Sequence, residues 1–298
     1  MAKKVWVQGP ISLDTVVYLS EFPTPGSFMN SLRTEERTGG TSANVALGLC
    51  TASVETGFIS YLGKDEIGKQ LLGVLERSLI RDLVITYIDD KSNHALVLVD
   101  GNSERTIISM ATPHLRELRM GDIPVKNGEV VAFVLWREEF LADLHRAQSA
   151  GCFTVVGAGA LADPAVDHAD LLIGSRNDFP SELHPEEHLH RFTTIVLTDG
   201  INGAVLYNGD TKIKQPVFKV DIKDTTGAGD AFIAGFLAGI AHELNPTQAL
   251  EIAAQWAASS VQFNSSIPPA FEVVKEQWGI DLILLALLTN GFSRFAIL

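Results

Sequence analysis

The chain has 298 residues and a mass of 32.2 kDa, which suffices for two average domains or for one large α/β domain with an appendage. Hydrophobic residues make up 46% of the chain and charged residues 20%, so enough apolar side chains are present to offset chain entropy, and disorder is excluded as the main state. The 23 basic and 36 acidic residues give a net charge of −13, which disfavours nucleic acid and anionic membranes as partners.

The cysteines and the ends of the chain carry few signals. Cys50 and Cys152 lie outside any CxxC motif, so we expect two reduced thiols in a cytoplasmic protein rather than a zinc site or a disulfide. The apolar run after Lys4 is too short for a signal peptide. The apolar run 282–288 is far shorter than the ~20 residues that span a bilayer, and the tail 279–298 that contains it receives no functional assignment.

Strands and helices are predicted to alternate along most of the chain. The first strand, at 5–9, is an apolar run that ends in glycine. Further strands are expected at 55–61, 130–135, 153–156, 171–173 and 194–197, a hairpin over 203–207 and 215–220, and helices over 44–50, 67–78, 138–149, 228–242 and 247–263. This alternation predicts a mostly parallel sheet with helices on both faces.

Two segments, 15–37 and 86–110, interrupt the alternation. The first contains Pro23, Pro25 and Gly26 between an apolar and a polar run, and the second has an Asp-Gly-Asn turn at 100–102 between two apolar runs. Asp-Gly between apolar runs is typical of a β-hairpin. Both segments are therefore predicted to form strands of a small sheet apart from the main body.

Two glycine-rich loops resemble nucleotide-binding motifs only in part. Residues 63–70 approach a P-loop, but Gln70 stands where a Ser or Thr hydroxyl is needed for Mg²⁺, so an exposed strand-to-helix turn is the favoured interpretation. Residues 157–162 fit GxGxxA after a strand, but Pro164 falls where the pyrophosphate-binding helix would run. The favoured interpretation is that these small residues allow close packing at a strand end. An NAD-dependent dehydrogenase thus stays a minor alternative.

The third glycine-rich loop, at 224–230, is the most informative. Small residues at 227–229 allow close approach to a ligand, and the apolar run that follows predicts a buried helix. Backbone N–H groups at a helix N-terminus favour a bound anion. Asp230 falls in the first turn of this helix, where its carboxylate could accept a proton from an incoming hydroxyl. The pattern indicates phosphoryl transfer to an alcohol.

The sequence DTTGAGD at 224–230 resembles the DTxGAGD signature of the ribokinase-like (PfkB) carbohydrate kinase family. The resemblance extends to GGTSANVA at 39–46, to the strand and turn at 59–68, to TDGINGA at 198–204, and to IPP at 267–269. It implies an α/β kinase domain over 1–278, in which a Rossmann-like, mostly parallel sheet is flanked by helices. The segments 15–37 and 86–110 would form a small β-sheet lid over the active site.

Carried over residue by residue, the resemblance implies transfer of the γ-phosphate of ATP, with Mg²⁺, to a hydroxyl of a small sugar or nucleoside. Asp230 is expected to be the catalytic base, with the amides of Gly227, Ala228 and Gly229 as the anion hole. The expected substrate-binding residues are Asp14, Gly40 and Asn44, and the expected nucleotide-binding residues are Asn177, Thr198, Gly200, Gly203 and Gln255. Asp224 is expected to help hold a monovalent cation such as K⁺, as in some family members.

Departures from the family pattern leave alternatives open. In the family's NxxE motif Asn177 is present, but Pro180 stands in place of the Glu, and Asp178 or Glu182 would have to replace it. The GG segment has no basic residue, which favours a neutral substrate. The alternatives to a sugar kinase are a nucleoside kinase of the same family and a catalytically weak, sugar- or nucleotide-binding regulatory protein. Homodimerisation through the exposed face of the lid is a further expectation.

Overall fold

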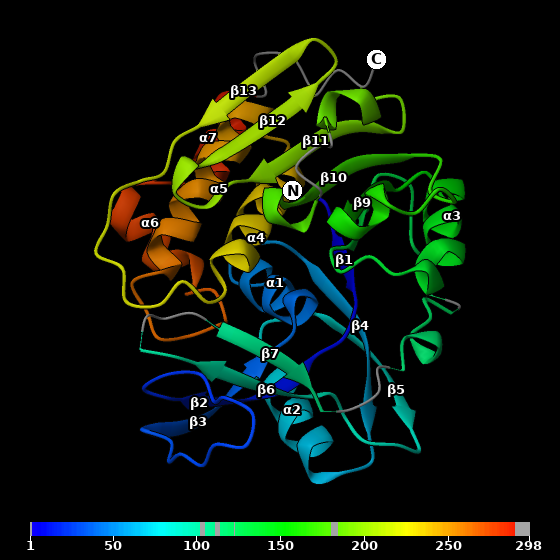
Figure 1. Cartoon of the computed structure of the whole chain (residues 1–298). Coiled ribbons are helices and arrows are strands. Elements are labelled where there is room, and N and C mark those ends of the chain that lie inside the picture. The colour runs from blue at the N-terminus through cyan, green and yellow to red at the C-terminus, as the bar shows by residue number, and fades with distance from the viewer. Residues whose placement is uncertain (1, 102–104, 111–113, 122, 180–183, 290–298) are drawn as a thin grey trace.

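A computed structural model describes residues 2–101, 105–110, 114–121, 123–179 and 184–289 (Figure 1). Over this part of the chain it contains two β-sheets of unequal size. A large sheet crosses the molecule, and a small sheet lies beside one end of it. The mixed α/β architecture and the separate small sheet confirm the predicted fold class.

The large sheet has nine strands within the described residues, in the order β13-β12-β11-β10-β9-β8-β1-β4-β5. Its strands are β1 (Val5–Gln8), β4 (Thr56–Gly63), β5 (Asp82–Ile88), β8 (Val130–Phe133), β9 (Phe153–Gly157), β10 (Ala169–Ser175), β11 (Phe192–Thr198), β12 (Ala204–Asn208) and β13 (Thr211–Gln215). All neighbours pair in parallel except β11–β12 and β12–β13, which are antiparallel.

Helices cover both faces of the large sheet, as the alternation predicted. They are α1 (Thr41–Leu49), α2 (Glu66–Glu76), α3 (Leu141–Ser149), α4 (Ala228–Ala241), α5 (Pro246–Ser260), α6 (Phe271–Trp278) and α7 (Leu282–Thr289). Successive strand side chains point to opposite faces, so Val5 and Val7 of β1 belong to one core cluster and Trp6 to the other. The first cluster includes residues of α1, α2, α4, α5, α6 and α7, and the second includes residues of α3.

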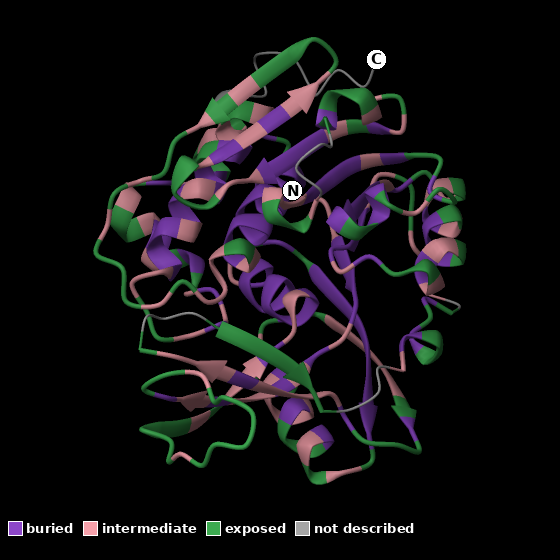
Figure 2. Ribbon diagram, viewed as in Figure 1, coloured by how far each residue is buried: buried purple, intermediate pink, exposed green. Residues whose placement is uncertain are grey.

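Helix α4 occupies the centre of the first core. Every residue from Ala231 to Ala241 is buried, because the helix packs against α1, α5 and β10 (Figure 2). Such a helix has no solvent-facing side that would require polar residues, which explains why its sequence is apolar all round. The loop that precedes α4 is consequently fixed by a rigid element.

The small sheet has four strands among the described residues, in the order β3-β2-β6-β7. They are β2 (Ser12–Tyr18), β3 (Arg33–Gly39), β6 (His94–Val99) and β7 (Arg105–Ser109). Strands β6 and β7 are antiparallel, as the Asp-Gly signal predicted. β7 lies on the edge and is exposed along its whole length (Figure 2).

Several boundaries differ from the sequence-based expectation. Residues 86–88, placed in the small sheet, belong to β5, which pairs with β4 in the large sheet. The second strand of the 204–215 hairpin lies at 211–215 and not at 215–220, because the turn at Gly209 is shorter than expected. Part of the tail 279–298 forms α7, and residues 290–298 lie outside the described part. Within that part, no helix is long and apolar enough to cross a membrane.

Candidate active site

The loop before α4 adopts the backbone geometry that its sequence predicted. Gly227 caps the helix with φ +78°, a left-handed conformation, and a Cβ at this position would lie 2.2 Å from the carbonyl oxygen of Ser266. Only glycine fits there without strain. Gly229 is exposed and Asp230 is half-buried, so ligands can reach this end of the helix.

Two N–H groups of this loop are available to an anion. Those of Gly227 and Gly229 have no hydrogen-bond acceptor among the described residues, whereas that of Ala228 donates to the Thr225 carbonyl over 3.3 Å. Backbone N–H groups at a helix N-terminus stabilise bound phosphate. The predicted anion hole is therefore supported most directly at Gly227 and Gly229.

Asp230 lies beside this group of amides and contacts α1. The side-chain amide of Asn44 donates to its Oδ2 over 2.7 Å. Burial raises the pKa of Asp230 to about 6, against the opposing effects of hydrogen bonds from Asn44 and Thr41. A carboxyl group with such a pKa is ionised at neutral pH and is basic enough to accept a proton in a transition state.

The other predicted substrate-binding residues lie near Asn44 and Asp230: the Asn44 N–H donates to the Gly40 carbonyl over 2.9 Å, and the charge of Asp14 is close enough to act on the pKa of Asp230. Asp14 on β2 is half-buried and accepts a 2.7 Å hydrogen bond from Ser12, while burial raises its pKa. A Cβ on Gly39 would lie 2.0 Å from Oδ2 of Asp14, so the absence of a side chain leaves room for this carboxylate. Gly40 has φ +94° and is the N-cap of α1. The structure thus brings Asp14, Gly40 and Asn44 to the vicinity of Asp230.

Two buried polar atoms near this group have no partner within the described residues. They are Oδ1 of Asn44 and Oγ of Ser42. An unpaired buried polar atom is costly unless a ligand or water satisfies it. A sugar hydroxyl could donate to Oδ1 of Asn44 while a second hydroxyl contacts Asp14, because these side chains offer acceptors of the kind that hydroxyl groups need.

The predicted nucleotide-binding residues of β10 and β11 lie at the carboxyl ends of neighbouring strands. Ser175 pairs with Thr198, and Asn177 follows in the next turn. The turn after Thr198 is closed by a 2.7 Å hydrogen bond from the Asp199 N–H to the carbonyl of Gly203. Gly200 and Gly203 both have positive φ, +50° and +89°, which the turn requires. Pro180 and Glu182 lie outside the described residues.

These strand ends share one sheet edge with the end of β1. Parallel strands direct their carboxyl ends to the same edge, where open α/β sheets bind ligands. Gly9, after β1, approaches Ser42 so closely that a Cβ there would lie 2.0 Å from its Oγ. Strands β8 and β9 separate β1 from β10, a span of about 14 Å at ~4.8 Å per strand. An elongated ligand would be needed to reach both groups of residues.

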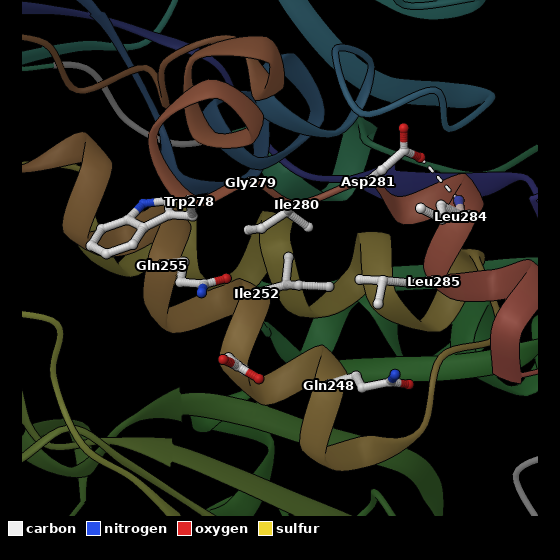
Figure 3. Close-up of a pocket in the computed structure, with 10 residues that line it drawn as sticks. Gln248, Ile252, Gln255, Trp278, Gly279, Ile280, Asp281, Leu284 and Leu285 are labelled. Carbon is white, nitrogen blue, oxygen red and sulfur yellow. Dashed lines mark hydrogen bonds between the residues drawn. The ribbon is translucent and has the colours of Figure 1, made fainter.

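Gln255 is placed differently from the other predicted nucleotide-binding residues. It lines a cavity of about 300 Å³ between α5, the end of α6 and α7, where Figure 3 shows it near Trp278, Ile252 and Ile280. None of the other predicted site residues lines this cavity. Its role in nucleotide binding is a prediction that this position does not favour.

Asp224 forms an ion pair that the sequence did not indicate. Arg37 on β3 donates from Nη1 to Oδ2 of Asp224 over 2.8 Å, and the Thr226 N–H donates to Oδ1 over 2.8 Å. Burial would raise the pKa of Asp224, but these hydrogen bonds outweigh it and hold the pKa below its usual value. A second basic side chain, Arg105 on β7, donates to Oγ1 of Thr226 over 3.2 Å. Both arginines stand in the predicted lid segments, but only tertiary contacts bring them to this loop.

The two partial motifs do not form nucleotide sites. At 63–70 the side chain of Asp65 accepts the Gly68 N–H over 2.7 Å, so a carboxylate occupies the place of a phosphate. After β9, residues 158–161 form a single 3₁₀ turn instead of an α-helix, and Gly157 packs against the carbonyl of Val134. The dinucleotide-binding interpretation of 157–162 lacks the helix N-terminus that it requires.

Comparisons with known proteins relate most of the chain to one family of kinases. The model of the pfkB family of carbohydrate kinases matches residues 2–134 and 160–271. A nucleoside kinase of Methanocaldococcus jannaschii is 24% identical over 254 residues, which cover 79% of this chain and 82% of the relative. A ribokinase of Lactococcus lactis is 26% identical over 275 residues, covering 87% and 91%. The structure of Arabidopsis thaliana ribokinase complexed with ribose and ATP has the same fold, with a TM-score of 0.75 at 21% identity, covering 94% of this chain and 100% of that one.

Proposed function

Since the chain belongs to the pfkB family of carbohydrate kinases and is therefore a phosphotransferase acting on a carbohydrate or nucleoside, we propose that ATP is its donor, a small neutral sugar its acceptor and Asp230 its catalytic base. One observation carries the proposal: the carboxylate of Asp230 lies in the same helical turn as the N–H groups of Gly227 and Gly229, which have no acceptor among the described residues. Support for ATP comes from the ribokinase complex that contains it.

In the proposed reaction, Asp230 accepts the proton of the acceptor hydroxyl while the hydroxyl oxygen bonds to the γ-phosphorus and ADP leaves. The Gly227 and Gly229 N–H groups hydrogen-bond to the phosphoryl oxygens, whose charge they stabilise. Asn44 orients the base through its 2.7 Å hydrogen bond and offers Oδ1 to the acceptor. Asp14 accepts a second hydroxyl and so fixes the orientation of the sugar.

Mg²⁺ would accompany the nucleotide, because this ion prefers phosphate oxygens, water and one or two carboxylates to a cage made by the protein. The described residues contain no cluster of three or more metal-ligating side chains. Asp178, an exposed carboxylate after β10, is a candidate ligand among them. When bound, Mg²⁺ supplies positive charge to the transferring phosphoryl group.

ADP release across a panel of pentoses, hexoses and nucleosides tests this function. We expect turnover with a sugar that Asp230→Asn lowers by about 10²- to 10⁴-fold, while binding of a non-hydrolysable ATP analogue is retained. Asp221→Asn, an exposed carboxylate just before the loop, is the matched control and should retain full activity.

The alternatives give different results in the same panel. Turnover only with nucleosides would support a nucleoside kinase, which one of the relatives is. Binding of sugar and nucleotide without turnover by the wild type would support a regulatory protein. Full activity of Asp230→Asn would refute the assignment of the base.

We further propose a homodimer through the small sheet. Strand β7 exposes Ile107 and Ile108, with 62% and 46% of their surface accessible, and the β2–β3 connection exposes Leu32 at 70%. An exposed edge strand with apolar side chains favours pairing with another chain. Light scattering should give twice 32.2 kDa, and Ile107→Lys should convert the dimer to a monomer. A wild type that stays monomeric at micromolar concentration would contradict the dimer.

A further inference from the structure

A guanidinium group occupies the place where the family resemblance predicted a monovalent cation. Nη1 of Arg37 lies 2.8 Å from Oδ2 of Asp224, and the two side chains retain only 11% and 17% of their exposed surface. The rest of the group is fixed as well: Nε donates to Glu35 over 2.6 Å and Nη2 to the Tyr18 hydroxyl over 2.8 Å. A planar guanidinium held by partners on three sides is suited to a buried ion pair.

The oxygens that a cation would need at this point are already engaged. Oδ2 of Asp224 accepts from Arg37 and Oδ1 accepts from the Thr226 N–H. The neighbouring carbonyl of Val261 accepts the N–H groups of both Lys223 and Asp224, over 2.8 and 3.2 Å. A monovalent cation on this carboxylate would also stand beside a permanent positive charge, which repels it. The donor set does not fit a bound K⁺.

The ion pair lies close to the anion hole. Asp224 is three residues before Gly227 and, through the Thr226 N–H, fixes the backbone that leads into the helix. We propose that Arg37 is a built-in cation that takes over the role of K⁺ in this loop, so that catalysis and nucleotide binding are independent of monovalent cations. The part that concerns catalysis rests on the proposed kinase function, whereas the part that concerns ligand binding does not.

The first experiment compares the wild type in the chlorides of K⁺, Na⁺ and tetramethylammonium at equal ionic strength. We expect the thermal unfolding temperature to agree within error among the three salts. The affinity for a non-hydrolysable ATP analogue with Mg²⁺ and, where an acceptor is known, kcat should agree within about twofold. A ligand that binds only the folded state raises its melting temperature, so K⁺ binding would be visible without turnover. K⁺-specific stabilisation, or at least fivefold activation by K⁺, would overturn the inference.

The second experiment removes the guanidinium. Arg37→Gln uncovers the carboxylate of Asp224, so we expect analogue binding and kcat to fall by about tenfold in tetramethylammonium and to recover in part with K⁺. Arg37→Lys keeps the charge and should remain indifferent to K⁺. Arg33→Gln is the control, because Arg33 lies on the same strand, is exposed and contacts Glu35 at 3.6 Å and the ring of Tyr18 at 4.1 Å rather than Asp224.

The outcomes separate this inference from the proposed function. An Arg37→Gln variant with wild-type affinity and no response to K⁺ would refute the role of Arg37. If that variant does not fold, the salt comparison on the wild type decides. A protein that phosphorylates no acceptor but binds the ATP analogue equally in all three salts would contradict the kinase proposal and leave the built-in cation standing.

Discussion

The side-chain amide of Asn44 donates a 2.7 Å hydrogen bond to Oδ2 of Asp230, across 186 residues of sequence. The bond joins the first turn of α4 to α1, two helices that pack together in the same core cluster. It holds the carboxylate beside the N–H groups of the loop while burial weakens the acidity of Asp230.

The pH dependence of catalysis should report the pKa of Asp230. This pKa lies at about 6, and only the ionised carboxylate accepts a proton, so kcat/KM should be level above pH 7 and fall tenfold per unit below about pH 6. Asn44→Leu removes a donor that favours the ionised form, and should move the inflection upwards by about one unit. A profile that is level down to pH 4.5 in the wild type would contradict the role of Asp230.

Asp230→Asn should stabilise the protein at neutral pH. The pKa of Asp230 in the folded state is raised above the unfolded value of 3.8, so the ionised carboxylate disfavours the folded state. This cost in the free energy of unfolding is fully present above the folded-state pKa and vanishes as the pH falls towards 3.8. A pKa shift of this size corresponds to about 3 kcal/mol of unfolding free energy. Because Asp230 is only half-buried and solvent screens its charge, we expect Asp230→Asn to gain about 1–2 kcal/mol. Urea denaturation at pH 8 and pH 5 checks this: the difference in unfolding free energy from the wild type should shrink at pH 5.

Gly227→Ala should destabilise the fold and Gly229→Ala should not. The first substitution forces alanine into φ +78° with its Cβ 2.2 Å from the Ser266 carbonyl, whereas a Cβ at Gly229 meets nothing within 4 Å. We expect the free energy of unfolding to fall by about 1–3 kcal/mol for Gly227→Ala and by less than about 0.5 kcal/mol for Gly229→Ala. Equal stability of the two variants in denaturant titrations would show that the loop has a different conformation.

Gly39→Ala should impair acceptor binding selectively. Its Cβ would lie 2.0 Å from Oδ2 of Asp14 and displace that carboxylate. We expect KM for the sugar to rise by about tenfold or more, with KM for ATP changed less than about twofold, because the nucleotide residues lie at other strands. Thr38→Ala, the preceding residue on β3, serves as the control for damage to the strand. A matching rise in both KM values would show that Asp14 is not specific to the acceptor.

The sequence by itself determined the features that rest on local patterns. Apolar runs and turn residues placed most strands and helices, because side-chain alternation and glycine preferences act over a few residues. The contiguous motif at 224–230 predicted an anion-binding loop and its base for the same reason: a helix N-terminus and its first-turn carboxylate are built from consecutive residues. The resemblance then gave Asp14 and Asn44, which the fold brings near Asp230.

Only the tertiary structure decided which distant side chains meet. Arg37 and Asp224 are 187 residues apart, and nothing in the local sequence of either predicts their pairing. The edge strand β5 was missed in part because its pairing with β4 depends on long-range packing. Gln255 fits a family position by sequence, yet helix α7, built from a tail without an assigned role, encloses it with Trp278 in a different cavity. Local propensity determines whether a segment forms a helix or a strand, but contacts between these elements depend on how the whole chain packs. Those contacts decide which charged side chains surround the site.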